Sequence, residues 1–215
     1  MALPLYTNEP LPVDIRKDPV FAAASRNAQR LARTTSREGK LAAPLSYDDF
    51  EKMKKEIKAP GANLLLQLAW AFAARVGDLR RVHVEDVVLA EDEANSRGVP
   101  IAVTFREGKG AAFWGLYSAH AVVDRRLAQG LRQHLERIKP REPRAYLFTL
   151  GDQSVVSRAL AELGKNVSLR SVRKGAVVWL AQQGIEDLTL MNITGHKRRD
   201  TTSELVRRSD SKVRL

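Results

Sequence analysis

The stretch "ANLLLQLAWAFAARVGDLRRV" (residues 62–82) decides the fold, because it contains the most apolar run of the chain. Residues 62–74 are apolar nearly all round, which is typical of a helix that is buried on every side. We therefore predict a central helix over 62–74. Arg75 directly follows this run, and Asp78 lies three residues further on. An arginine at the end of a buried helix is costly unless it pairs with a carboxylate or faces an anion.

The residues before the central helix predict a second helix with a clear start. Ser46 and Asp49 have the spacing of a capping box, and Pro60 with Gly61 is expected to end the helix. Its apolar side chains recur at helical spacing, at Phe50, Met53 and Ile57. Further upstream we expect an extended arm over 1–17 and a short basic helix over 19–36.

The pattern changes from helix to strand after Asp78. Residues 85–92 favour a strand, and the apolar residues of 100–117 alternate on both sides of a predicted turn at 108–110, which is typical of a hairpin. Helices are expected again over 121–138, 153–164, about 168–183, 186–193 and 199–208. The predicted fold class is α+β and mostly helical, with a small antiparallel sheet inserted between helices.

The composition favours a polyanionic partner. The chain of 215 residues has 36 Lys and Arg against 25 Asp and Glu, a net charge of +11. Neutralising phosphates releases condensed counterions, so this excess favours nucleic acid. The chain has no cysteine, which excludes disulfides, Cys-based zinc sites and thiol catalysis. No run is long enough for a membrane span. We expect an intracellular location, in the nucleus or cytoplasm, while the Ala-, Ser- and Arg-rich stretch 21–37 leaves an organelle open.

Four further polar groups interrupt the apolar patterns. Lys109 lies between two glycines at the hairpin tip, where a lysine is either solvated or free to reach a ligand. Arg170 and Arg173 lie one turn apart at a predicted helix start, where free N–H groups already favour phosphate, so they can form a bidentate clamp or an ordinary charged helix end. His196 follows Gly195 and can act as a helix C-cap or as a proton donor.

The order of these groups resembles the catalytic domain of tyrosine recombinases, the lambda-integrase-like family, over about residues 44–208. The stretch "AARVGDLRRVHVEDV" is similar to the first box of the family, "REGKG" to its hairpin lysine, and "RSVRKGAVVWLAQQGIEDLTLMNITGH" to its second and third boxes. The last stretch is similar above all to the recombinases of retroelements and eukaryotic mobile elements. The implied organisation is an arm with a short basic helix at 1–43, followed by a catalytic-type domain at 44–215.

The resemblance implies phosphoryl transfer on DNA without a metal or another cofactor. Two arginines of the family neutralise the scissile phosphate, a lysine protonates the leaving 5′ oxygen, and a histidine assists proton transfer. These catalytic positions fall on Arg75, Lys109, Arg173 and His196. Other basic residues of the same stretches are expected to contact nucleic acid, namely Arg170, Lys174, Lys197, Arg198 and Arg199.

Two positions depart from the family pattern. The histidine of the second box falls on Arg170, and the nucleophilic tyrosine falls on Leu205. The tyrosines of the chain are at 6, 47, 117 and 146, all before His196. We therefore expect a DNA-binding protein derived from a recombinase, without strand cleavage. Two alternatives stay open: an active recombinase whose nucleophile is a replacement residue or is supplied in trans, and an RNA-binding or assembly subunit of a ribonucleoprotein.

Residues 1–43 are too few for the N-terminal helical domain with which the family clamps the other side of the DNA. The missing half of the clamp is expected to come from a partner protein or from a second copy of the chain.

Overall fold

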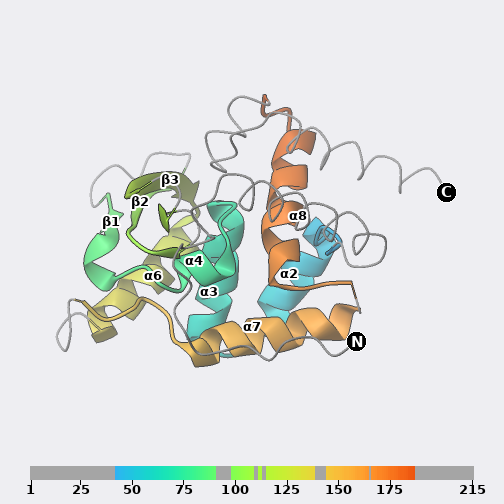
Figure 1. The fold of residues 1–215 in the computed structure, drawn as a ribbon, viewed down its shortest axis with the longest axis horizontal. Helices are drawn as coiled ribbons and strands as arrows, with labels where there is room; N and C mark the ends of the chain where they lie inside the picture. The colour runs from blue at the N-terminus through green and yellow to red at the C-terminus, as the bar shows by residue number, and fades with distance from the viewer. Residues whose placement is uncertain are drawn as a thin grey trace, which may run out of the picture. The chain divides into compact units, whose positions relative to one another are not determined.

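The computed structural model describes residues 42–90, 98–108, 111–112, 115–138, 144–164 and 166–186. These residues form six labelled α-helices, one short 3-10 helix and a three-stranded antiparallel sheet, which confirms the predicted α+β class (Figure 1). The division predicted at 43/44 lies at the edge of the described residues and stays a prediction. No helix in the described ranges is long and apolar enough to cross a membrane.

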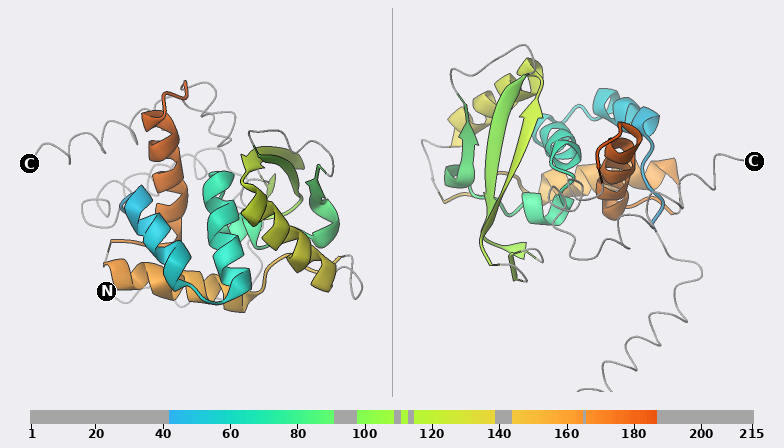
Figure 2. Two further views of the ribbon diagram at one scale, coloured as in Figure 1. Left: turned by 180° about the vertical axis from the view of Figure 1, so that it is seen from behind. Right: turned by 90° about the horizontal axis from the view of Figure 1, so that it is seen from above.

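Helix α3 (Pro60–Ala71) is the centre of the packing, as predicted. Leu65, Leu66 and Leu68 are fully buried. Helices α2 (Tyr47–Glu56) and α8 (Leu169–Gln182) pack on one side of α3, and α6 (Arg125–Ile138) with the sheet packs on the other (Figure 2). Helix α7 (Leu150–Leu163) crosses one end of this arrangement and contacts both α3 and α8. Burial on most sides explains why the polar side chains of α3 are confined to Asn63 and Gln67, which are part-buried and hydrogen-bonded to each other.

The predicted boundary between α2 and α3 is wrong in detail. The N-cap half of the capping box is present, since the Ser46 hydroxyl accepts a hydrogen bond from the Asp49 amide at 3.0 Å. Helix α2 already ends at Glu56, however, and Pro60 is the first residue of α3. Proline fits the first turn of a helix because its missing N–H has no helical partner there. The central helix therefore spans 60–71 and not 62–74.

The predicted hairpin and the strand predicted over 85–92 are both present, and they form one sheet. The strands β1 (Val87–Leu89), β2 (Val99–Phe105) and β3 (Tyr117–Val123) pair in the order β1-β2-β3. Alternate residues of β2 are buried from Val99 to Phe105, and Phe105 pairs with Tyr117. Residues 108 and 111–112 are helical, so the connection is longer than the tight turn that was predicted.

The helix predicted over 121–138 starts later than expected, because residues 121–123 belong to β3. Asp124 marks the change, since its Oδ1 accepts a hydrogen bond from the Leu127 amide at 2.8 Å and caps α6. The predicted apolar stripe of this helix is buried through Leu127, Leu131 and Leu135. Helix α7 begins three residues before the prediction, and α8 lies within one residue of it at each end.

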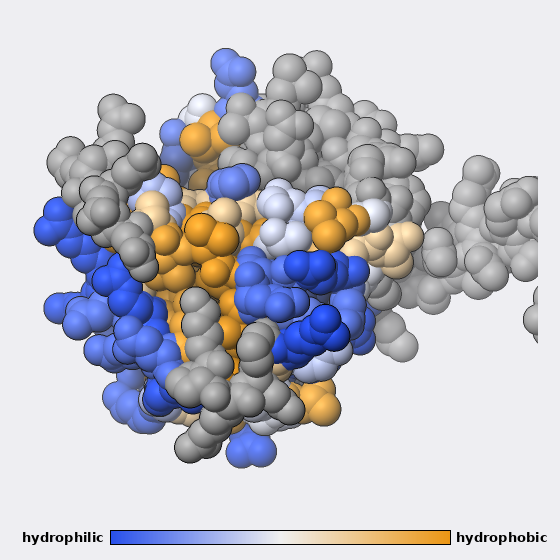
Figure 3. All heavy atoms as spheres, turned by 90° about the vertical axis from the view of Figure 1, so that its left-hand side faces the viewer, coloured by the Kyte–Doolittle hydropathy of each residue, from blue (hydrophilic) through white to orange (hydrophobic). Residues whose placement is uncertain are grey.

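The helices predicted over 19–36, 186–193 and 199–208 fall outside the described residues or touch them only at residue 186. The side of the molecule on which the sheet lies is not uniformly polar. Figure 3 shows hydrophobic residues gathered in its middle, with hydrophilic residues on either side. Val88 of β1 and Val122 of β3 are among the exposed large apolar side chains.

Candidate nucleic-acid interface

A strained turn after α3 places Arg75. Ala73 has a positive φ of 44°, a conformation that usually needs glycine. The Ala74 amide donates to the Ala69 carbonyl and the Ala73 amide donates to the Trp70 carbonyl, both at 3.0 Å, which is the hydrogen-bond pattern of a Schellman motif. Arg75 follows as the N-cap residue of the short helix α4 (Val76–Leu79). The turn therefore directs the chain out of the buried helix at Arg75.

Arg75 forms the ion pair that its spacing from Asp78 predicts. Arg75 Nη1 donates to Asp78 Oδ2 at 3.2 Å. The Asp78 side chain is only 8% exposed, whereas 47% of the Arg75 side chain remains exposed. The pair therefore neutralises a buried carboxylate and leaves part of the guanidinium accessible to a ligand. The structural and the anion-binding interpretations of Arg75 are compatible.

Helix α8 brings Arg173 within electrostatic range of Arg75. The pKa of Arg173 is lowered to about 10, mainly by burial and next by the positive charge of Arg75. The charge of Asp78 acts in the opposite direction, as does Tyr117 once it is ionised. Arg173 remains charged at neutral pH, so two like charges lie near each other where one of them is largely desolvated. A bound anion would relieve both the desolvation and the repulsion.

Arg170 lies in the first turn of α8, one turn before Arg173, and is exposed. The backbone N–H groups at the start of this helix are partly satisfied by the helix itself, because the Ser168 amide donates a hydrogen bond to Ser171 Oγ at 3.0 Å. The two arginines of the predicted clamp therefore differ in surroundings: Arg170 faces solvent, and Arg173 is partly buried near Arg75. Their predicted roles in phosphate binding stay predictions.

The segment before α2 holds α8 in place. The Leu45 amide donates to the Ser171 carbonyl at 3.0 Å, and Gly175 lies so close to Leu45 that a side chain would collide with the Leu45 carbonyl. Lys174 Nζ donates to the Ala42 carbonyl at 2.8 Å. In this structure Lys174 thus contacts the backbone of its own chain, and its contact with nucleic acid stays a prediction.

The hairpin end lies against the Arg75–Asp78 pair. Gly108 has a φ of 98°, and a side chain at this position would collide with the Asp78 carboxylate. Lys109 is the next residue in the sequence but lies outside the described residues. The same is true of His196, Lys197, Arg198, Arg199 and Leu205, so their predicted roles also stay predictions.

A second ion pair, which sequence reasoning missed, supports the same hairpin end. Arg106 Nε donates to both oxygens of Asp86, at 2.7 and 2.8 Å, and Arg106 Nη2 lies 2.6 Å from Oδ1. The Asp86 side chain is 2% exposed, and the pKa of Arg106 is raised by its hydrogen bond to Asp86 and then by the carboxylate charge. His83 Nδ1 lies 3.5 Å from Asp86 Oδ2. This pair joins the start of β1 to the residue that follows β2.

Tyr117 is a second residue near the site that sequence reasoning did not place there. It begins β3 and is partly buried. Burial raises the pKa of its hydroxyl and so does the charge of Asp78, whereas Arg173 and Arg75 lower it. The available signal was its position on the inward-facing alternation of β3, together with Ala119 and Ala121.

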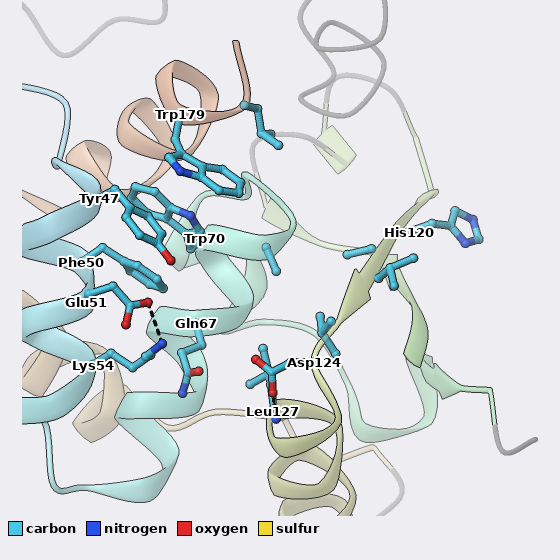
Figure 4. A pocket seen from close by; sticks show the side chains of 15 residues that line it. Tyr47, Phe50, Glu51, Lys54, Gln67, Trp70, His120, Asp124, Leu127 and Trp179 are labelled. Carbon is cyan, nitrogen blue, oxygen red and sulfur yellow. Dashed lines mark hydrogen bonds and ion pairs between the residues drawn. The ribbon is translucent and has the colours of Figure 1, made fainter. Parts of the chain in front are cut away.

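A hollow near these elements is a separate feature. A pocket of about 470 Å³ lies between the aromatic side chains of α2, α3 and α8 and the end of β3 with the start of α6 (Figure 4). Neither Arg75 nor Arg173 lines it. Figure 4 shows four rings on one wall, and Asp124 and Leu127 on the other; the rings belong to Tyr47, Phe50, Trp70 and Trp179. Within the described ranges no three His, Cys, Asp or Glu side chains gather closely enough to hold a metal ion.

Comparisons by sequence and by structure give different results. No protein-family model matches the chain, and no curated protein matches it significantly. Solved structures do match. XerH site-specific recombinase bound to difH substrate has a TM-score of 0.58 and 15% identity, over 84% of this chain and 54% of that chain. Tn1549 transposon integrase in complex with circular intermediate DNA has a TM-score of 0.58 and 14% identity, over 92% and 76%.

Two further matches agree with these. A lambda integrase dimer bound to a core site has a TM-score of 0.54 and 16% identity, over 87% of this chain and 71% of that chain. XerA recombinase has a TM-score of 0.56 and 16% identity, over 84% of this chain and 66% of that chain. The chain thus spans less than two thirds of the XerH and XerA chains. The described residues have the fold of tyrosine-recombinase catalytic domains.

Proposed function

We propose that the chain binds duplex DNA by holding a backbone phosphate between Arg75 and Arg173, and that it does not cleave the strand. The observation that carries this proposal is the approach of the two arginines. Burial and the charge of Arg75 lower the pKa of Arg173 to about 10, which means that the protein without a ligand disfavours the charged form of Arg173. A phosphate oxyanion is the ligand that would reverse this penalty.

Two further features support a nucleic-acid ligand. The net charge of +11 favours a polyanion whose binding releases counterions. The fold is that of structures determined in complex with DNA, namely XerH with difH and Tn1549 integrase with circular intermediate DNA. Phosphate contacts carry affinity and position the duplex, whereas base contacts carry specificity. The proposal therefore concerns affinity and register, and it names no target sequence.

The absence of cleavage is proposed from the sequence. Leu205 occupies the position at which the resemblance places the nucleophile, and leucine has no group that can attack phosphorus. No tyrosine follows His196. Binding without cleavage would make the chain a module that occupies recombination sites or one that assembles with an active relative.

Binding to labelled duplex DNA at several salt concentrations tests the proposal. We expect the full chain to bind with an affinity that falls steeply with salt concentration. Arg75→Ala and Arg173→Ala should each weaken binding and reduce the salt slope, that is, the slope of log affinity against log salt concentration, by about 1. Arg132→Ala is the matched control, since it removes the same charge from an exposed position on α6. Equal losses in all three variants would show diffuse attraction and would overturn the site.

A nicked suicide substrate tests cleavage separately. We expect no covalent protein–DNA product; a product that survives denaturation would establish the alternative of an active recombinase. Competition with duplex RNA at fixed salt tests the ligand. If RNA displaced DNA at equal nucleotide concentration, the ribonucleoprotein alternative would replace DNA binding.

A further inference from the structure

Tyr117 is held rigidly at the edge of the candidate site. It pairs with Phe105 across the β2–β3 ladder, and the two rings stack with centroids 4.9 Å apart and an interplanar angle of 14°. Phe105 is 2% exposed and belongs to the core. A ring stacked on a core residue and fixed by strand pairing has little freedom, so the position of its hydroxyl is set by the fold.

The polar groups of the site lie within electrostatic range of this ring. Gly108, three residues after Phe105, lies against the Asp78 carboxylate, which pairs with Arg75 at 3.2 Å. The hairpin end that carries Tyr117 therefore lies on the Arg75–Asp78 pair. Asp78, Arg173 and Arg75 all act on the Tyr117 hydroxyl, and the influence is reciprocal because Tyr117 also acts on Arg173.

The other two described tyrosines have different surroundings. Tyr47 stacks on Trp179 with centroids 5.4 Å apart and lines the aromatic pocket. Tyr146 stacks on His83, and its hydroxyl donates to Glu107 Oε2 at 3.2 Å.

The chemistry of the Tyr117 hydroxyl suits binding better than attack. Its pKa is raised above the ordinary value, chiefly by burial, so the group is a neutral phenol throughout the neutral range. A neutral phenol is a poor nucleophile but a good hydrogen-bond donor. As a donor it also adds no charge to the repulsion between Arg75 and Arg173.

We infer that Tyr117 is a phosphate ligand: its hydroxyl donates a hydrogen bond to a nonbridging oxygen of the DNA phosphate that Arg75 and Arg173 hold. This inference rests on the proposed function and adds to it a neutral donor from a third element. The site then consists of a partly exposed cation from the end of α3, a partly buried cation from α8 and a fixed hydroxyl from β3.

The test compares Tyr117→Phe with the matched variant Tyr47→Phe in the full chain. Each variant removes one hydroxyl and keeps the ring, so the stack on Phe105 or on Trp179 is retained. With labelled duplex DNA we expect Tyr117→Phe to bind about tenfold more weakly, as for a lost hydrogen bond to a charged group, and Tyr47→Phe to bind as the native chain. Thermal denaturation checks that both variants are folded.

The salt slope distinguishes the inference from the proposed function. Tyr117→Phe removes no charge, so its slope should equal that of the native chain, whereas Arg173→Ala should lose about 1 from the slope.

Native affinity in Tyr117→Phe with a loss of affinity in Arg173→Ala would overturn the role of Tyr117 and leave the proposed function intact. Failure of the native chain to bind DNA in a salt-dependent way would overturn the function itself. A covalent product on the nicked substrate that Tyr117→Phe abolishes would overturn the ligand role and make Tyr117 a nucleophile.

Discussion

Gly175 of α8 and Leu45 of the segment before α2 are in direct contact: a Cβ on Gly175 would overlap the Leu45 carbonyl and lie 2.9 Å from Trp70 Cζ3. Because both obstacles belong to the buried core, a side chain here must displace α8 from its neighbours. We expect Gly175→Ala to destabilise the fold by about 1–3 kcal/mol, in spite of the better helix propensity of alanine.

Gly130→Ala is the control for that substitution. Gly130 also lies inside a helix, and a Cβ there meets no atom within 4 Å. It should gain stability by up to about 1 kcal/mol from helix propensity alone. Thermal denaturation measures the stability of both variants. Equal shifts in the two variants would show that the Leu45 contact does not constrain α8.

Gly108 gives a prediction about the hairpin. Gly108→Ala and Gly115→Ala both place alanine at a positive φ, 98° and 76°, so both should cost about 1–2 kcal/mol of stability. Only Gly108 lies against Asp78; a Cβ on Gly115 meets nothing within 4 Å. Gly108→Ala should therefore weaken DNA binding severalfold and Gly115→Ala should not. Binding losses that match in the two variants would mean that the Asp78 contact does not position the site.

Asp86 gives a prediction about the support of that hairpin. Asp86→Asn removes a buried charge that holds Arg106 through three short contacts, so we expect a Tm loss of several degrees. Glu85→Gln removes the same charge from an exposed neighbour and should leave the Tm nearly unchanged. Hydrogen exchange should show faster exchange of β2 and β3 amides in Asp86→Asn alone. Unchanged protection of both strands would contradict the supporting role.

The buried charge of Arg173 should lower the stability of the fold and strengthen DNA binding. Its pKa is lowered in the folded chain, which means that the fold disfavours the charged form. Arg173→Met keeps an unbranched stem and removes the charge, so we expect a gain of about 1 kcal/mol, or roughly 2–4 °C in Tm, together with weaker DNA binding. A loss of stability would show that the guanidinium holds the fold together.

The pH dependence of this effect has a defined sign. Because the folded pKa of about 10 lies below the ordinary pKa of an arginine, the cost is fully present below pH 10 and is relieved as the pH rises above that value. The Tm advantage of Arg173→Met over the native chain should therefore be constant from pH 7 to 9 and narrow above about pH 10. Tyr117 does not cancel in this difference, because Arg173 lowers its pKa and Arg173→Met removes that effect.

Local features of the fold could be predicted from the sequence because they depend on near neighbours. The cap at Ser46, the burial of α3 and the pairing of Arg75 with Asp78 all follow from residues within one or two turns. Boundaries were less accurate where two signals compete. At Pro60 the sequence indicated an end, but the same residue is equally suited to begin a helix.

Long-range contacts were not predictable from patterns. The pair of Asp86 with Arg106 joins two sides of a loop, and the approach of Tyr117 to Arg173 joins β3 to α8. The local sequence around Asp86 does not indicate Arg106 as its partner, and the local sequence around Tyr117 does not indicate Arg173. The succession of basic residues suggested a common site through resemblance, and the structure supplies the neighbours of two of them, Arg75 and Arg173.

The contact of residues 42–45 with α8 has a consequence for protein synthesis. Lys174 and Ala42 are hydrogen-bonded although they lie 132 positions apart in the sequence. Ala42 therefore leaves the ribosome long before Lys174. Helix α3 emerges early, with an apolar surface whose covering helices α7 and α8 are not yet made. Partly synthesised chains therefore expose this helix until residue 182 has left the exit tunnel, and chaperones that bind apolar segments would meet the chain during that interval.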